Sequence, residues 1–387
     1  MTNIMKCLSL LFASLCLMVS SLQADSYSEL TKDFSFGKAD IQSMSVLTFG
    51  PEGLLFVGDA NAGKVFAIDL KDRVQNTSKE GFSLENVEAK LASLLGTTAQ
   101  GVVIHDFAVN PISQNIYLAV SRSDATQLGF WKLPNDLGAA TILLKIDPKG
   151  EISEVNLEKI SFDSAEVPKL IEPGQQSWRK SDMRTESITD IAYAEGKLYV
   201  TGLSNEEFAS NLRILDFPFT DNSQASSLEV WHIAHGKSET EAPIRTLLPY
   251  DFNGETHILA SYTCTPFVSF SVKDLEDGKH LKVKTLAEFG FSNMPIDIIR
   301  YRRDDKDYIL MSNTSKALIK IDPDDIPDAE NISRKLEKGE YTVGLDHDVL
   351  SRVGITHIDN YNSENVLVLQ RMPNGLLSLR TYANAWL

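Results

Sequence analysis

The segment HIAHGKSETEAPIR brings imidazole and carboxylate groups close together in the sequence. His232 and His235 stand three residues apart, and Glu239 and Glu241 follow them. Neutral imidazole and carboxylate suit zinc and other divalent ions, so this spacing could build a metal site. Residues three apart on a strand face opposite sides, so both histidines could reach one ion only from a loop. Exposed or core histidines are the alternative, and the metal hypothesis rests on His235, Glu239 and Glu241.

Three aspartates, Asp106, Asp190 and Asp297, occupy similar places near the starts of three apolar segments. A carboxylate at such a place commonly accepts hydrogen bonds that tie neighbouring strands together. The alternative is a ring of carboxylates around a channel, which could hold Ca²⁺. The sequence therefore allows a divalent metal, calcium or zinc, without fixing which.

Cys264 stands between two threonines and before a proline. We expect this cysteine to be half-buried and structural, because no histidine or asparagine is adjacent in the sequence to mark it as a nucleophile. The other two cysteines, Cys7 and Cys16, belong to an N-terminal leader, so the mature chain should contain no internal disulfide.

The stretch Leu47–Leu70 indicates which elements position these groups. It reads as three short strands of alternating apolar residues separated by Gly, Pro, Asn and Asp, which is typical of an antiparallel meander. The same pattern returns five times, beginning at His105, Thr189, Thr246, Ile296 and Gly354. Six such repeats predict an all-β fold, a single six-bladed β-propeller with four-stranded blades.

Three segments depart from the repeat. A strand near Phe34–Phe36 is expected to close the ring by joining the C-terminal blade. The segment Ser83–Gly96 predicts one short amphipathic helix, with Ser83 as its N-cap and Gly96 at its end. The charged segment Asn156–Glu186 has the length of a loop that is either functional or disordered.

Residues 1–24 read as an export signal peptide rather than as structure. Lys6 precedes a mostly apolar run, Cys7–Leu22, that is too short to span a bilayer. Cleavage after Ala24 would start the mature chain at Asp25, with one domain over residues 25–387. No second apolar run reaches ~20 residues. We therefore expect a periplasmic or secreted monomer without a membrane span.

The charge balance narrows the choice of partners. With 37 Lys and Arg against 53 Asp and Glu, the formal net charge is −16. Phosphate binding needs a basic surface, so the composition argues against nucleic acid as a partner. A small molecule, a metal ion or another protein suits the acidic chain better.

The turns of a meander blade fall into two sets on opposite faces. Turns between the first and second strands read as simple hairpins, for example Pro51–Gly53. Turns between the second and third strands, and crossings between blades, are rich in polar side chains that should converge at one mouth of the channel. The candidate ligand-binding residues of this mouth are His105, Asp106, Arg184, Glu186, Arg245, Cys264, Asn293 and Arg371.

The Leu47–Leu70 unit resembles the blades of six-bladed propellers that include NHL-repeat proteins and the gluconolactonase-like and sorbosone-dehydrogenase-like families. Lactonases of this kind hold a divalent metal with a Glu of the first blade and later Asn and Asp residues. The resemblance implies Asn293, Asp190 and Asp297 as corresponding positions, while the first inner strand, SMSVLTFGPEG, has no Glu ahead of it. The blocks AHGKSETEAPIRT, SYTCTPFVSF and NMPIDIIRY are similar to those of uncharacterised exported bacterial propellers, which imply no function.

These observations favour an exported propeller that binds a ligand or another protein through one channel mouth. A metal-dependent hydrolase of lactonase type is the second hypothesis, and it requires three or four ligand atoms around one ion. The third hypothesis is a redox-associated propeller working with a separate cytochrome or quinone protein. The chain has no C-x-x-C-H haem motif, so that activity would need an external cofactor. The sequence assigns no catalytic residue and favours binding over catalysis.

Overall fold

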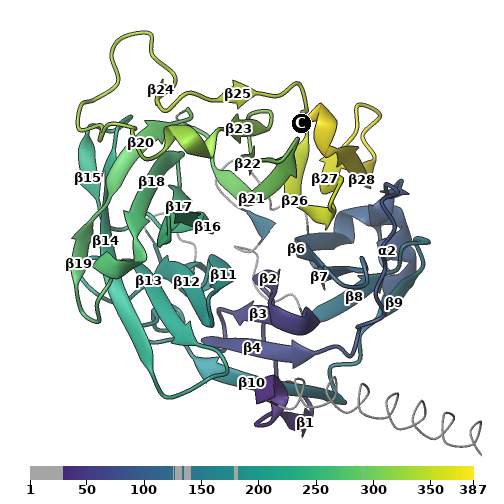
Figure 1. Ribbon diagram of the computed structural model, residues 1–387. Coiled ribbons are helices and arrows are strands. Elements are labelled where there is room, and N and C mark those ends of the chain that lie inside the picture. The colour runs from purple at the N-terminus through teal and green to yellow at the C-terminus, as the bar shows by residue number, and fades with distance from the viewer. Residues whose placement is uncertain (1–28, 125, 127–132, 135–140, 178–181, 291) are drawn as a thin grey trace, which may run out of the picture.

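The computed structural model describes residues 29–124, 126, 133–134, 141–177, 182–290 and 292–387. The predicted signal peptide, residues 1–24, lies outside these residues. The described chain forms six sheets arranged as blades around a common axis (Figure 1). The predicted all-β, six-bladed propeller is therefore confirmed. In the described part of the chain, no helix has both the length and the apolar character needed to cross a membrane.

We number the blades by the order of their inner strands along the chain. Blade 1 contains β2 (Val46–Phe49), β3 (Leu55–Asp59), β4 (Lys64–Asp69), β10 (Ile160–Glu166) and β1 (Ser35–Gly37). Blade 2 contains β6 (Val102–Val109), β7 (Ile116–Arg122), β8 (Ile142–Ile146) and β9 (Ile152–Glu154). Blade 3 contains β11 (Asp190–Ala194), β12 (Lys197–Leu203), β13 (Ser210–Asp216), β14 (Ser223–His232) and β15 (Lys237–Glu239), and β19 (His280–Lys282) pairs with β14.

The remaining blades follow in chain order. Blade 4 contains β16 (Ile244–Phe252), β17 (Glu255–Tyr262), β18 (Pro266–Ser271), β20 (Lys284–Glu288) and β24 (Val343–Gly344). Blade 5 contains β21 (Pro295–Arg303), β22 (Lys306–Asn313), β23 (Ile319–Ile321) and β25 (Asp348–Val349). Blade 6 contains β26 (Ile355–Asn362), β27 (Asn365–Arg371), β28 (Leu377–Ala383) and β5 (Ser83–Leu84). Short 3₁₀ turns are η1 (Pro51–Gly53), η2 (Ala99–Gly101), η5 (Met183–Glu186), η6 (Val272–Asp274), η7 (Pro323–Asp325) and η8 (Asn384–Trp386).

The order of the blades around the ring differs from their order in the sequence. Inner-strand contacts place blade 1 between blades 2 and 3, and blade 2 between blades 1 and 6 (Figure 1). After blade 2, the chain returns to blade 1 and forms its fourth strand, β10, before it enters blade 3. Blade 1 is therefore built from two separate stretches of sequence.

Blade 6 is the second composite blade. Its outer strand, β5, comes from the N-terminal part of the chain and pairs with β28. The strand expected near Phe34–Phe36 exists as β1, but it pairs with β10 at the outer edge of blade 1. The prediction that this strand joins the C-terminal blade is therefore wrong, and β5 has that role instead.

Residues 70–82 link β4 of blade 1 to β5 of blade 6 and contact blade 2 between them. Asp72 accepts hydrogen bonds from the Asn115 amide and the Tyr117 hydroxyl of blade 2, each at 2.8 Å. The Asn365 amide of blade 6 donates to the Lys79 carbonyl at 2.9 Å. This linker thus fastens blade 2 to its neighbours on both sides.

The predicted amphipathic helix is present as α2 (Val87–Leu95). Val87, Leu91 and Leu95 are buried beside blades 2 and 6, as their helical spacing indicates. Gly96, with φ 64°, ends the helix in the left-handed conformation that glycine readily adopts. Ser83 is not the N-cap, because it belongs to β5 and pairs with Arg380.

The segment Asn156–Glu186, predicted to be a long loop, contains the strand β10. After β10, the chain is anchored by Arg213, whose side chain is fully buried. Its guanidinium donates to four backbone carbonyls, those of Pro168, Lys169, Ser187 and Leu203. A buried guanidinium therefore replaces the strand hydrogen bonds that this irregular stretch lacks.

Candidate functional site

Inner strands of four blades are irregular near their first residues. The pairing register shifts between Ile104 and Asp106, Ile244 and Thr246, Pro295 and Asp297, and Ile355 and Ile358. A bulge of this kind redirects a side chain. The lining of this end of the channel includes one residue near the start of each inner strand, namely Val46, His105, Thr189, Arg245, Ile296 and His357, together with Asp106, Asp190 and Asp297. Leu133 and Pro134 also line it, and the space left there is only about 40 Å³.

Four aspartates form the next layer of the channel and tie adjacent blades together. Asp106 of blade 2 accepts a hydrogen bond from the Leu47 amide of blade 1 at 2.7 Å. Asp190 of blade 3 accepts one from the Leu247 amide of blade 4 at 2.7 Å. Equivalent bonds run from Ile358 to Asp297 at 3.0 Å and from Val109 to Asp359 at 2.7 Å. The other oxygen of each carboxylate accepts the amide of the following residue. The strand-tying interpretation of the first three aspartates is confirmed.

Asp359 was not identified from the sequence, although the last repeat carries the same pattern of one aspartate in an apolar inner strand. Burial raises the pKa of Asp190 to about 7 and that of Asp359 to about 6. Burial, together with the neighbouring carboxylates, also raises the pKa values of Asp106 and Asp297 well above their usual range. The charge of the channel therefore changes near neutral pH.

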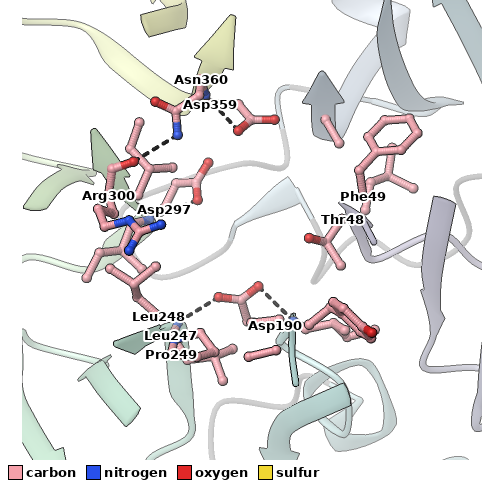
Figure 2. Close-up of a pocket in the computed structure, with 18 of the residues that line it drawn as sticks. Thr48, Phe49, Asp190, Leu247, Leu248, Pro249, Asp297, Arg300, Asp359 and Asn360 are labelled. Atoms are coloured by element: carbon pink, nitrogen blue, oxygen red, sulfur yellow. Dashed lines mark hydrogen bonds between the residues drawn. The ribbon is translucent and has the colours of Figure 1, made fainter. Parts of the chain in front are cut away.

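The channel widens toward the other face of the ring, where its volume is about 570 Å³. Figure 2 shows Asp190, Asp297 and Asp359 on the walls of this space, with Arg300 and Thr48 nearby. The rim adds further acidic and aromatic side chains, those of Glu195, Asp251, Phe49, Tyr193 and Tyr250. The first hairpin turns lie here, so the larger cavity is at the face opposite the predicted mouth.

Some of the predicted mouth residues do meet. The Arg245 guanidinium lies 3.3 Å from a Glu186 carboxylate oxygen and 3.3 Å from the Thr263 hydroxyl. His105 lines the same narrow end and contacts the Ser121 hydroxyl through Nε2 at 2.7 Å. Crossings between blades and the β17–β18 turn therefore do share one face.

Three other predicted residues make local contacts instead. Arg184 donates to the Ile171 carbonyl at 2.7 Å, and Asn293 donates to Asn313 at 3.2 Å. Arg371 forms an ion pair with Glu88 of α2 on the outside of the ring. None of Arg184, Asn293 and Arg371 is among the described residues that line the channel.

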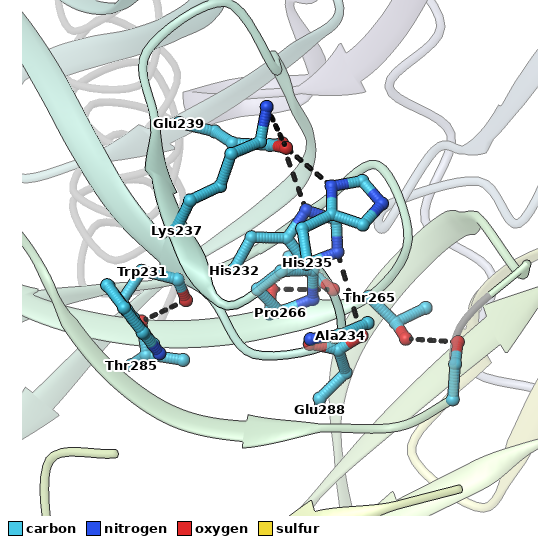
Figure 3. A network of polar contacts seen from close by, with 12 residues as sticks. Trp231, His232, Ala234, His235, Lys237, Glu239, Thr265, Pro266, Thr285 and Glu288 are labelled. Atoms are coloured by element: carbon cyan, nitrogen blue, oxygen red, sulfur yellow. Dashed lines mark hydrogen bonds and ion pairs between the residues drawn. The ribbon is translucent and has the colours of Figure 1, made fainter. Parts of the chain in front are cut away.

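A separate polar cluster surrounds the end of β14 (Figure 3). In the β14–β15 hairpin, the Glu239 carboxylate contacts both histidines. One of its oxygens lies 2.9 Å from His232 Nδ1, and the other contacts His235 Nδ1. The two imidazole rings lie 3.9 Å apart between centroids. Burial disfavours a charged His232, but contacts with Cys264, Glu239 and Glu288 raise its pKa to about 11. Both histidines in turn lower the pKa of Glu239 to about 2 against the effect of burial.

Cys264 joins this cluster from the turn between β17 and β18. It is 7% exposed, more deeply buried than the sequence predicted. Donor atoms of His232, His235 and Cys264 all lie within 4.8 Å of one another. Glu241 is exposed, beyond the end of β15. Glu288 was missed because nothing in the sequence separates it from an ordinary strand glutamate.

No family model matches the chain, and no curated protein matches it. A solved structure from Thermus thermophilus, described as a putative oxidoreductase (glucose dehydrogenase), is similar over 90% of this chain and 99% of its own, with 11% identity and a TM-score of 0.36. The Cps50 (Swd1) β-propeller domain of Myceliophteria thermophila is similar over 88% of this chain and 83% of its own, with 12% identity and a TM-score of 0.33. Similarity at this level carries no functional argument.

Proposed function

We propose that this protein is an exported binding module that takes a small organic cation into the wide end of its channel. The single observation behind this proposal is the acidic lining of a cavity of about 570 Å³. Among the described lining residues, six carboxylates face one guanidinium: those of Asp106, Asp190, Glu195, Asp251, Asp297 and Asp359 against that of Arg300. Export is supported by the signal-peptide pattern of residues 1–24.

The chemistry of the lining favours an organic cation over a bare ion. Pockets of a few hundred Å³ match small organic ligands. Tyr193, Tyr250 and Phe49 line the same cavity as Glu195 and Asp251, and ammonium groups bind to aromatic rings as well as to carboxylates. Each of the four buried aspartates already accepts two backbone amides, and burial raises its pKa, so the attraction for a cation rests on the rim carboxylates Glu195 and Asp251.

Binding fits this geometry better than lactonase chemistry does. The positions implied by resemblance to lactonases are Asn293, Asp190 and Asp297. Asn293 directs its amide to Asn313 and its oxygen to the Ser315 amide, while the two aspartates line the channel. The three side chains therefore do not form one ligand shell.

The experiment is calorimetric titration of mature protein with spermidine and with choline, using glucose as a neutral comparison. We expect at least one cation to bind, and to bind more weakly as salt is added. Glu195→Gln and Asp251→Asn should each raise Kd by about tenfold, which corresponds to one charged contact of about 1.4 kcal/mol. Asp221→Asn, an exposed change on the β13–β14 loop, is the control. Wild-type affinity in both rim variants, or no cation binding, would overturn the proposal.

A further inference from the structure

The histidine cluster beside the β14–β15 hairpin lies outside the channel and has no part in the proposed cation binding. It gathers groups from three elements of two adjacent blades (Figure 3). His232, His235 and Glu239 come from the hairpin of blade 3, Cys264 from the β17–β18 turn and Glu288 from β20. These elements are adjacent only because the ring brings blades 3 and 4 together.

The donor atoms already lie close to the spacing that a tetrahedral ion needs. Nitrogen and sulfur ligands stand about 2.0–2.3 Å from zinc, which places neighbouring ligand atoms roughly 3.3–3.8 Å apart. The donors of His232, His235 and Cys264 lie within 4.8 Å of one another. Side-chain rotations alone can close the difference, since His235 sits in a turn and is 48% exposed.

Two buried polar atoms in the cluster have no hydrogen-bond partner among the described residues. They are His232 Nε2 and Glu288 Oε1, which face each other at 3.6 Å. The two side chains are 2% and 0% exposed. The two atoms form an ion pair with each other, but 3.6 Å is longer than a hydrogen bond, and an ion between them would give both a closer contact.

The surrounding shell is also arranged as in metal sites. Glu239 holds His232 and His235 through their Nδ1 atoms, which orients both rings and leaves their Nε2 atoms for other partners. Cys264 and Thr265 both have left-handed backbone, with φ of 69° and 67°, which is unusual for a β-branched residue such as threonine. Backbone strain of this kind clusters at functional sites.

We propose that His232, His235 and Cys264 bind a zinc ion, with Glu288 as the fourth ligand. Imidazole and thiolate select zinc over calcium and magnesium, which prefer oxygen shells. The Cys264 thiol and the protonated His232 imidazole each give up one proton to solvent as the sulfur–metal and nitrogen–metal bonds form. Glu239 acts as the positioning residue, and Glu241 takes no part.

Cobalt(II) is the probe, because it enters tetrahedral zinc sites and its bond to a thiolate absorbs in the near ultraviolet. Mature protein is stripped with a chelator, checked for an intact thermal transition, and titrated with cobalt and then with zinc. We expect one cobalt per chain, a sulfur-to-cobalt absorption band, and loss of that band when zinc is added.

Variants separate metal binding from a purely structural cluster. His235→Ala should weaken cobalt binding at least tenfold, and Cys264→Ser should remove the sulfur band. His257→Ala at the other end of β17, and Glu241→Gln, are matched controls that should bind as wild type does. A native fold without the sulfur band, or equal binding by His235→Ala and wild type, would show that the cluster is only an ion-pair network.

Discussion

Replacing Arg213 with methionine should destabilise the whole propeller. The change keeps an unbranched side chain of similar length but removes the guanidinium, leaving the carbonyls of Pro168, Lys169, Ser187 and Leu203 without that donor. All four belong to, or contact, the irregular chain that connects β10 to blade 3.

The magnitude follows from two opposing effects. Each hydrogen bond to a charged group contributes about 1.5–3 kcal/mol, so four bonds give roughly 6–12 kcal/mol before desolvation. Burying the guanidinium costs several kcal/mol, and this burial also lowers the pKa of Arg213 to about 9. We expect a net loss of about 3–5 kcal/mol in the free energy of unfolding.

The assay is urea unfolding of wild type, Arg213→Met and the control Arg302→Met, followed by near-ultraviolet circular dichroism. Arg302 is 64% exposed, so its replacement should leave the unfolding midpoint unchanged. A domain of this size should lose about 2 °C in Tm per kcal/mol, hence roughly 6–10 °C for Arg213→Met. A loss below about 1 kcal/mol would refute the idea that this guanidinium anchors the segment.

Three further predictions concern the channel, the ring and the leader. The raised pKa values of Asp190 and Asp359, about 7 and about 6, mean that these groups contribute stability that is complete below about pH 4 and lost as pH rises through 6 to 7. Asp359→Asn should therefore flatten the pH dependence of unfolding between pH 4 and 7, by at most about 3 kcal/mol, and an unchanged slope would contradict this. Leu84→Asp should weaken the pairing of β5 with β28 and lower Tm, whereas Leu94→Asp on the exposed side of α2 should not. N-terminal sequencing of exported protein should begin at Asp25, and uncleaved chain in the cytosol would refute the leader.

The sequence predicts the positions of the strands better than it predicts which strands pair with one another. Inner strands expected near residues 46, 105, 189, 245, 296 and 354 begin at 46, 102, 190, 244, 295 and 355. Alternation and turn residues determine such local structure. The order of the blades around the ring depends on which blade the strands β10 and β5 join. All six blades have similar outer edges, so the sequence does not indicate that β10 pairs with β4 and β5 with β28.

The candidate sites were predicted unevenly for the same reason. Spacing alone identified the His235–Glu239 pair, because both belong to one hairpin. Cys264 and Glu288 lie beside that pair only because blade 4 packs against blade 3. No local sequence pattern predicts this contact. The wide cavity was missed because its rim comes from ordinary hairpin turns, whose side chains become a site only when six blades surround one axis.

The two composite blades set the order in which this chain can complete its fold during synthesis. The strands β2, β3 and β4 emerge early but lack their outer partner until β10 has been made, after all of blade 2. The strand β5 waits longer, because its partner β28 (Leu377–Ala383) follows every other described strand. The last of the described strands therefore pairs with one of the first. A ribosome-bound chain should remain an open arc, sensitive to proteases within residues 70–82, until β28 has emerged and paired with β5.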